Sequence, residues 1–219
     1  MSTAPLRVRP LEARDIPQVI DLSTRIYGPG AGWSVEQLES HLQVFPDGQL
    51  VATLPEGAGG QVIGMAASLI VAWDDYEITD SWRTFTAAGM FTNHDPVRGR
   101  TLYGAEVMAD PAARGRGVGS ALYRARRKMV ERLDLDRVRA GARLRGYHLV
   151  ADQMTAAAYV AEVVAGRRRD PTLTFQLRRG FTVIGVVSDY LRNDPESLGW
   201  AALIEWNRRA GVPKHHADR

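Results

Sequence analysis

The sequence predicts a mixed α/β (α+β) fold in a single domain over residues 1–219, with about seven strands and flanking helices. Two observations support this class. Short apolar segments typical of strands alternate with amphipathic segments of helical spacing along the whole chain. An apolar strand also meets a helix across a glycine-rich turn within residues 106–122. A chain of 219 residues is long enough to bury one full hydrophobic core.

The helices are predicted from capping residues and breakers. A first helix runs from about Arg14 to Tyr27 and is ended by Gly28-Pro29-Gly30. Ser34 begins a second helix, and Gln37 at its third position completes a capping box. Further helices are expected over 120–133, 152–165 and 170–180. They would lie between strands and cover the sheet.

The strands are predicted from apolar and β-branched runs bounded by turn residues. They are expected at 6–9, 49–54, 61–71, 101–109, 138–142, 181–191 and 200–206. The second and third would form a hairpin around 55–60, and the last two a terminal pair. Residues 208–219 are expected to form a flexible tail.

Residues 73–99 form a long insertion between two of these strands and carry five acidic and five aromatic residues. Long connections in compact domains often form binding loops. One interpretation is a pocket for a cationic amine. In the alternative, Trp82, Phe85 and Phe91 anchor the insertion or form a contact between two copies of the chain in a homodimer.

The most informative segment is the strand, turn and helix between Glu106 and Leu122. Its glycines leave backbone amides unhindered around one helix start, and two arginines add positive charge. Free N–H groups that converge at a helix N-terminus favour a diphosphate. The predicted anchoring residues are Arg114, Gly115, Arg116, Gly117, Val118, Gly119 and Ser120.

Two other phosphate-binding loops fit this turn poorly. A Walker loop ends in Gly-Lys-Ser/Thr, whereas this turn has no lysine before Ser120. A Rossmann fingerprint needs an acid at the end of the next strand, and Arg137–Gly141 has none. The turn instead resembles the acetyl-CoA signature of the GNAT N-acetyltransferases, Q/R-x-x-G-x-G/A, in which Arg114, Gly117 and Gly119 take the defined positions.

The resemblance extends over nearly the whole chain. Arg178-Arg179-Gly180-Phe181 is similar to a second landmark of the family, a helix that ends in Gly-Phe before the sixth strand. Residues 146–181 are similar to the acetyltransferase half of bacterial proteins that fuse a GNAT domain to a nitrilase-type hydrolase. The resemblance implies a central mixed, mostly antiparallel sheet that splays beside the turn. It also implies a bacterial acyltransferase without the hydrolase half.

The implied chemistry is direct attack of a primary amine of a small molecule or peptide on acetyl-CoA in a ternary complex. Backbone groups of Val107, Met108 and Ala109 would bind the coenzyme and the developing oxyanion. Glu106, an acid in an apolar strand, is the first candidate for the base. An equally weighted alternative makes it the partner of an arginine on the following helix. His148 and His94 are further candidate bases.

The proton donor for the departing thiolate is left open. Many family members have a tyrosine four residues before the glycine of the Gly-Phe landmark, and this sequence has Gln176 there. Glutamine cannot supply a proton at a useful pKa. Either water or another residue would supply the proton, and the candidate residues are Tyr190, Tyr159 and Tyr147.

Composition narrows the function further. The absence of cysteine excludes disulfides and thiolate chemistry, and it fits a cytoplasmic protein. No apolar run is long enough to span a bilayer, no signal peptide begins the chain, and no metal-ligand spacing occurs. Eleven Arg or Lys and three acids between Arg114 and Arg145 give a local charge of +8. A nucleic-acid-binding protein is therefore one alternative function, ranked below a catalytically silent module that binds acyl-CoA.

Overall fold

The structure is a computed structural model that describes residues 5–55 and 60–211. Its seven strands form one sheet in the order β1-β2-β3-β4-β5-β7-β6. They are β1 (Arg7–Pro10), β2 (Leu50–Leu54), β3 (Gln61–Val71), β4 (Thr101–Ala109), β5 (Arg137–Arg143), β6 (Thr182–Val187) and β7 (Ala201–Asn207). Every neighbouring pair is antiparallel except β4 and β5, which are parallel. The predicted fold class is therefore confirmed.

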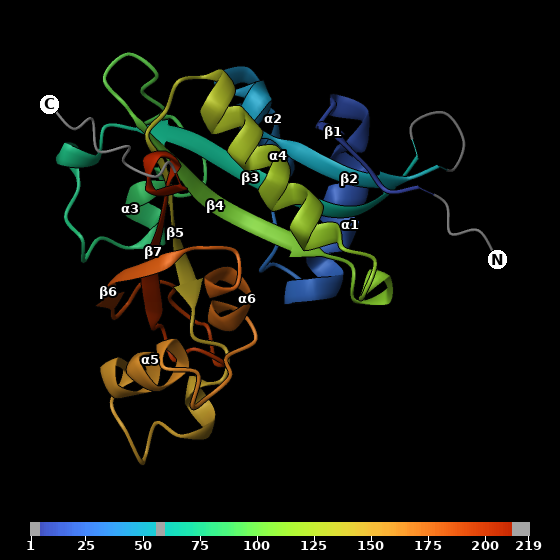
Figure 1. The fold of residues 1–219 in the computed structure, drawn as a ribbon. Coiled ribbons are helices and arrows are strands. Elements are labelled where there is room, and N and C mark those ends of the chain that lie inside the picture. Colours follow the sequence, from blue (N-terminus) through green and yellow to red (C-terminus); the bar gives the residue numbers. More distant parts are fainter. Residues whose placement is uncertain (1–4, 56–59, 212–219) are drawn as a thin grey trace, which may run out of the picture.

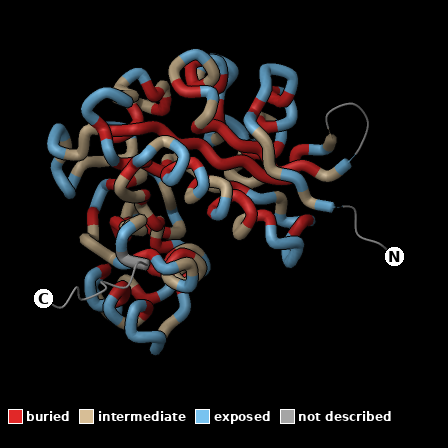
Figure 2. The backbone as a smooth tube through the Cα atoms, turned by 45° about the horizontal axis from the view of Figure 1, so that its top comes forward, coloured by how far each residue is buried: buried red, intermediate tan, exposed pale blue. Residues whose placement is uncertain are grey.

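Helices cover both faces of the sheet (Figure 1). They are α1 (Ile16–Tyr27), α2 (Val35–Val44), α3 (Trp82–Phe85), α4 (Val118–Arg132), α5 (Ala156–Val164) and α6 (Leu173–Leu177). One buried cluster joins the sheet to α4, α5 and α6, and a second joins its other face to α1, α2 and the 73–99 insertion. Figure 2 shows the buried residues concentrated along the strands, with exposed residues on the outer turns of the helices.

The sheet divides between β4 and β5. These strands are register partners only over Thr101–Tyr103 and Arg137–Arg139. Beyond Tyr103, β4 stays paired with β3 while β5 continues with β7, so the two strands diverge (Figure 1). A shift in register at Ala67 and Ser68 of β3 marks the same level of the sheet. The splay implied by the family resemblance is present, and it exposes one edge of the outer half of β4.

Several predicted boundaries differ from the structure. The helix expected from Asp152 begins only at Ala156, because Thr155 accepts a hydrogen bond from the amide of Ala158 and caps it there. The strand expected over 181–191 ends at Val187. The predicted tail begins with a short 3-10 helix over Arg208–Gly211, and Arg208 pairs with Asp134 at 2.6 Å. Residues 212–219 of that tail, and 56–59 of the predicted hairpin turn, lie outside the described residues.

Candidate functional site

The glycine-rich turn presents unpaired backbone donors. The amides of Arg114 and Arg116 donate to the carbonyls of Pro111 and Ala113 within the turn. Within the described chain, no acceptor is bonded to the amides of the next residues around the helix start: Gly115, Gly117, Val118, Gly119 and Ser120. A helix N-terminus with several free N–H groups attracts an anion. The turn therefore has the geometry of an anion site.

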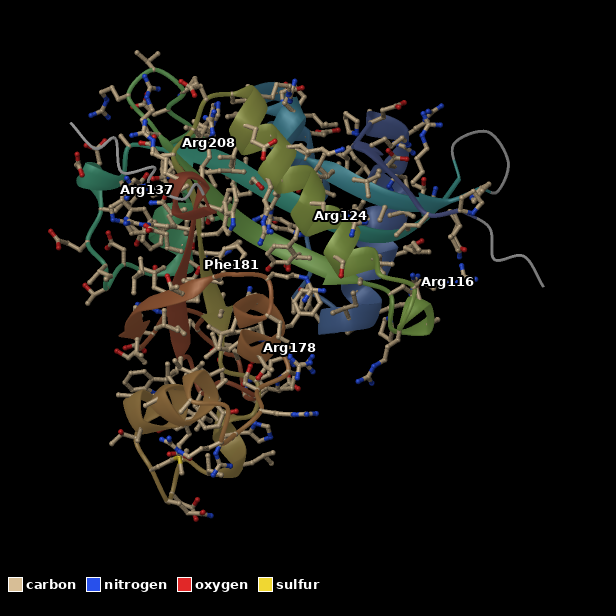
Figure 3. All side chains as sticks on the ribbon, in the orientation of Figure 1. Arg116, Arg124, Arg137, Arg178, Phe181 and Arg208 are labelled. Atoms are coloured by element: carbon tan, nitrogen blue, oxygen red, sulfur yellow. The ribbon has the colours of Figure 1, made fainter. Side chains whose placement is uncertain are left out.

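The conformation of this turn depends on glycine at two positions. Gly115 and Gly117 have φ values of +84° and +76°, in the left-handed region that side chains other than glycine adopt at a cost. Open space surrounds the place where a Cβ would lie at either residue. Arg114, before these glycines, and Arg116, between them, are exposed and form no ion pair with another described residue. Figure 3 shows Arg116 on this turn. The turn leaves both backbone and charge available to a ligand.

Helix α6 packs closely against the start of α4. A Cβ on Gly119 would lie 2.8 Å from Cζ of Phe175, so only glycine allows this approach. Arg179 stacks on the Phe175 ring, with its guanidinium carbon 3.3 Å from the ring centroid, and donates a hydrogen bond to Oγ of Ser120. The Ser120 hydroxyl is thus already hydrogen-bonded within the protein, whereas the Ser120 amide has no partner among the described residues. These contacts pack α6 against the start of α4, beside the fork where β4 and β5 diverge.

The outer half of β4 connects this turn to the splayed part of the sheet. Val107, Met108 and Ala109 are paired with Ala66, Met65 and Gly64 of β3. Their opposite edge has no register partner in β5. A free strand edge can pair with an extended ligand as an added strand would. The three predicted backbone-binding residues therefore lie at the open edge.

Glu106 lies in the same half of β4 and points towards α1. Its Oε1 accepts a hydrogen bond of 2.9 Å from the hydroxyl of Tyr27. The side chain keeps partial access to solvent, but the surrounding protein desolvates the carboxylate and raises the pKa of Glu106. The bond from Tyr27 and the charges of Arg126 and Arg143 oppose that rise. A carboxyl with a raised pKa beside an open strand edge is suited to accepting a proton.

The predicted ion pair between Glu106 and an arginine of the following helix takes a different form. Arg126 of α4 is 2% exposed, and its guanidinium donates to the backbone carbonyl of Glu106 rather than to the carboxylate. It also donates to the carbonyl of Ala67 and, at 2.9 Å, to Oγ of Ser68. Gly104 leaves room for it, since a Cβ there would lie 2.9 Å from Nη1. Arg126 thus fixes β3 to β4 where the register shifts.

Tyr190, a predicted catalytic residue, enters the fork between β4 and β5 from the segment between β6 and β7. Its hydroxyl is hydrogen-bonded to that of Tyr103, the last residue of β4 that pairs with β5. The ring lies against Gly141 of β5, where a Cβ would be 2.0 Å from Cζ of Tyr190. Burial raises the pKa of Tyr190. The hydroxyl is therefore held between the strands.

Two irregular segments meet beside this fork. The amide of Trp82 in the insertion donates to the carbonyl of Tyr190 at 3.0 Å. The indole Nε1 of Trp82 donates to the carbonyl of Ala105 at 2.9 Å. Non-glycine residues with positive φ occur in both segments: Ala87, Ala88 and Phe91 in the insertion, and Asp189, Asn193 and Leu198 between β6 and β7. Strained backbone of this kind is typical of binding and catalytic loops.

The other predicted candidates lie away from Glu106. Nδ1 of the exposed His148 is 2.8 Å from the carbonyl of Glu196, and among the described residues no hydrogen bond joins this ring to Glu106. Nδ1 of His94 accepts from the amide of Ile70 at 3.0 Å, and the ring stacks on Phe45. His148 thus contacts a backbone carbonyl, and His94 both binds a backbone amide and packs on an aromatic ring.

The remaining tyrosines named as proton donors are also engaged elsewhere. Tyr159 donates to Asp170 at 3.0 Å, and Tyr147 donates to the carbonyl of Met154 at 3.1 Å. A tyrosine that the sequence analysis did not name, Tyr123 of α4, is instead bonded to Gln176 of α6 at 2.9 Å. Its position beside Leu122 in an amphipathic helix resembles that of a packing residue, so the sequence offered no sign of this contact.

The insertion favours the anchoring alternative. Phe85 and Phe91 are fully buried, and the Phe85 ring stacks on Trp73, Tyr76 and Tyr103. Of its acids, Asp75 and Asp95 pair with Arg98. These aromatics fill the core beneath the insertion and do not line an open acidic pocket.

Neither a metal cluster nor a membrane-spanning helix is found in residues 5–55 and 60–211. No group of three or more His, Asp or Glu side chains there is placed to hold a metal ion. None of the helices described is both long and apolar enough to cross a membrane.

Comparison with known proteins agrees with this geometry. Residues 16–149 match the family model described as the acetyltransferase (GNAT) family. The chain is 38% identical over 207 residues to a probable hydrolase, YhcX, from Bacillus subtilis (strain 168), covering 94% of this chain and 39% of that protein. It is 35% identical over 205 residues to an uncharacterized N-acetyltransferase, YkwB, of the same organism, covering 92% and 88%. The chain thus spans less than half the length of YhcX.

A solved structure extends the comparison. The GphF GNAT-like decarboxylase in complex with isobutyryl-CoA superposes with a TM-score of 0.71 and 21% identity, covering 92% of this chain and 98% of that one. At this identity the likeness shows the fold. The family model covers more than half of the chain, and YkwB exceeds 30% identity over most of both proteins. The glycine-rich turn, the splayed sheet and these matches together show that the chain belongs to the acetyltransferase (GNAT) family.

Proposed function

We propose that the protein is an acetyl-CoA-dependent N-acetyltransferase that acetylates a primary amine of a small molecule or peptide by direct attack in a ternary complex. One observation carries the proposal. The unpaired amides at the start of α4 adjoin the open edge of β4, and the partly accessible carboxyl of Glu106 lies on that strand. An anion site, a strand edge and a base thus follow one another along residues 106–120.

The donor would be held by its diphosphate and its extended arm. The free amides of Gly115, Gly117 and Val118 suit a diphosphate, and the macrodipole of α4 favours its charge. Exposed arginines without an ion partner among the described residues lie on the turn and on the two helices beside it: Arg114 and Arg116 on the turn, Arg124 further along α4, and Arg178 at the end of α6. The open edge of β4 would pair with the amides of the pantetheine arm. The GphF structure contains an acyl-CoA on the same fold, which supports this choice of donor.

Amide formation requires the amine to lose a proton. An alkylammonium has a pKa of about 10, so a base must act during attack. Glu106 faces α1, and desolvation raises the pKa of this carboxyl above its ordinary value. We assign to Glu106 the role of the base that accepts this proton. A backbone N–H at the open edge near Val107–Ala109 would stabilise the oxyanion.

The tests of this proposal also distinguish two alternative functions. A silent module would bind acyl-CoA without turnover. A nucleic-acid-binding protein would use the local charge of +8, but much of that charge is already engaged. Arg126 is buried, Arg139 pairs with Glu205, and Arg143 pairs with Asp194. This engagement favours coenzyme A at the turn over a polyanion along the helix.

The proposal is tested with the full chain in two steps. Isothermal titration with acetyl-CoA is expected to give a dissociation constant in the low micromolar range, whereas duplex DNA at the same salt concentration is expected to bind weakly. A panel of small amines and amino-terminal peptides is then assayed by release of free thiol, with acetyl-CoA and longer acyl-CoAs as donors. Tight binding without turnover on any acceptor would favour the silent module. Failure to bind acetyl-CoA would exclude both coenzyme A functions.

A further inference from the structure

The contact between α4 and α6 contains a buried polar pair on the opposite side of the sheet from α1. Tyr123 and Gln176 are each 6% exposed, and their side chains meet at 2.9 Å. The Tyr123 ring packs edge-on against Phe175 and Phe181, so its hydroxyl is held in one direction. Buried polar groups normally satisfy all of their hydrogen bonds. This pair does not.

One polar function of the pair is left without a partner. Nε2 of Gln176 donates to the Tyr123 hydroxyl, while the buried Oε1 of Gln176 has no hydrogen-bond partner. The hydroxyl proton of Tyr123 then has no described acceptor either. Exchanging the amide oxygen and nitrogen would pair Oε1 with the hydroxyl and leave Nε2 unpaired instead. In both arrangements the pair retains hydrogen-bonding capacity that a ligand at the open edge of β4 could use.

Charged groups surround the tyrosine hydroxyl from several elements. Arg126 lies 5.8 Å from the Tyr123 ring centroid, Arg127 and Arg179 add positive charge, and Glu106 adds negative charge. Burial is the largest influence and raises the pKa of Tyr123, opposed by Arg126, the Gln176 hydrogen bond and Arg179. The hydroxyl therefore stays protonated through neutral pH and remains a donor.

We propose that Tyr123 donates the proton to the sulfur that leaves when the thioester is cleaved, and that Gln176 is a positioning residue that holds its hydroxyl. The amine nitrogen forms a bond to the carbonyl carbon and loses a proton to Glu106. The carbon–sulfur bond then breaks, the sulfur takes the electron pair, and it receives the Tyr123 proton to become the coenzyme A thiol. Water returns a proton to Tyr123, and Glu106 releases its proton to solvent.

The arrangement of the sheet supports this division of roles. Glu106 bonds to Tyr27 of α1, whereas Tyr123 lies between α4 and α6 on the other face. The strands diverge between them, so an acyl group at the open edge would have the base on one side and the proton donor on the other. The amine adds to one face of the carbonyl and the sulfur leaves from the tetrahedral intermediate, so two separate groups can each reach the atom they serve. The inference rests on the proposed acetyl transfer.

The test measures binding, independently of any acceptor. Coenzyme A and desulfo-coenzyme A, which lacks the sulfur, are titrated into the full chain at pH 7 and pH 9.5. A cysteine thiol ionises near pH 8.5 and a simple alkyl thiol at somewhat higher pH, so thiolate is present at pH 9.5 and almost absent at pH 7; a donor bonds more strongly to a thiolate than to a thiol. The preference of the wild type for coenzyme A is expected to grow about tenfold across this interval. In Tyr123→Phe, the growth should fall below about threefold.

Tyr147→Phe is the matched control, because Tyr147 is also 6% exposed but donates to the carbonyl of Met154 and belongs to neither α4 nor α6. It should behave as the wild type. Growth of the preference in Tyr123→Phe equal to that in the wild type would overturn the assignment. A wild type that binds acetyl-CoA but shows no growth of the preference would also overturn the assignment. The proposed acetyl transfer would stand in that case. A wild type that binds neither coenzyme would remove the proposed function and this inference together.

Turnover gives a second measurement once an acceptor is known. Tyr123→Phe should lower kcat roughly 100-fold while the affinity for acetyl-CoA stays within about twofold. Exchanging the pair, as Tyr123→Gln with Gln176→Tyr, returns a hydroxyl to the contact between the two helices, now from α6. This double variant should recover about tenfold of the rate lost in Tyr123→Gln alone. An unchanged kcat in Tyr123→Phe would overturn the proposal, whether or not the exchanged variant folds.

Discussion

The glycine-rich turn and the outer half of β4 adjoin one another but are built in opposite ways. The turn, residues 114–120, is largely exposed, is contiguous in sequence, and has amides that bind no described part of the protein. The outer half of β4 is bonded to side chains distant in sequence: the Glu106 carboxylate accepts from Tyr27 of α1 and the Glu106 carbonyl accepts from Arg126 of α4, although the edge away from β3 has no register partner. The turn is therefore shaped mainly by its own glycines, whereas β4 depends on partners distant in sequence.

The largest expected effect tests how strongly β4 depends on those partners. Arg126→Met removes a 2% exposed guanidinium and leaves Oγ of Ser68 and two carbonyls without their donor. We expect the free energy of unfolding to fall by about 3–5 kcal/mol, measured by urea denaturation. Arg124→Met, an exposed position on the same helix, is the control and should change it by less than about 0.5 kcal/mol. Similar effects of both variants would show that Arg126 does not join β3 to β4.

Acid should affect the buried region next most strongly. His41 of α2 is fully buried, stacks on Phe91, and places Nε2 2.7 Å from the carbonyl of Gly89. Burial lowers the pKa of His41 to about 4 from the ordinary histidine value of 6.5. The unfolded chain then binds more protons between pH 6.5 and pH 4, so stability is lost as the pH falls through this interval, by up to about 3 kcal/mol.

The measurement compares unfolding free energies at several pH values for the wild type and for His41→Gln, which does not titrate. The variant should be less stable at pH 7 but should lose less stability than the wild type between pH 6.5 and pH 4. Parallel pH curves would show that His41 does not titrate on unfolding.

The third effect separates chemistry from binding. Glu106→Gln should lower kcat about 100-fold and flatten its pH dependence, with acetyl-CoA affinity within about twofold. Because the pKa of Glu106 is raised in the folded protein, this carboxyl stabilises the fold only while protonated, and the contribution is lost as the pH rises through the folded pKa. The variant should therefore be more stable than the wild type at pH 7.

Glu131→Gln, an exposed acid on α4, is the control and should leave kcat unchanged. Full turnover in Glu106→Gln would mean that the base lies elsewhere.

The smallest expected effect lies in the turn. Gly117→Val places a β-branched residue at a φ of +76° and covers neighbouring amides, so acetyl-CoA affinity should weaken about tenfold with little change in kcat at saturation. Gly166→Val is the matched control, since Gly166 has a φ of +75° and open space around its Cβ position, but follows α5. Both variants can be compared by titration calorimetry. Equal affinity in both would argue against an anion site at the turn.

The same contrast explains what could be predicted from the sequence. The turn was predictable because the glycines that shape it, Gly115 and Gly117, are close together in sequence, and the strand before it has a local apolar pattern. The position of Glu106 as the one acid in that apolar strand could also be read from the sequence. Its hydrogen bond to Tyr27, 79 residues away, could not. The Tyr123–Gln176 pair joins residues 53 apart, and nothing local distinguishes either from a packing residue.

Helix ends were predictable only where a local cap decides them. Ser34 and Gln37 form the predicted capping box. The start of α5 was placed too early, because 150–154 is apolar enough to continue a helical pattern but folds into turns, and Thr155 sets the boundary. Sequence distance between contacting groups, more than composition, thus limits what can be predicted here.

The bond between the amide of Trp82 and the carbonyl of Tyr190 has a consequence for how this protein could be redesigned. It ties together two irregular segments, and neither includes the turn before α4. The insertion is also bonded to α2 through Gln37 and Ser40 and to β3 through Ile70. An engineer who replaces either segment alone would therefore lose this bond, whereas the backbone of the turn would keep its own contacts.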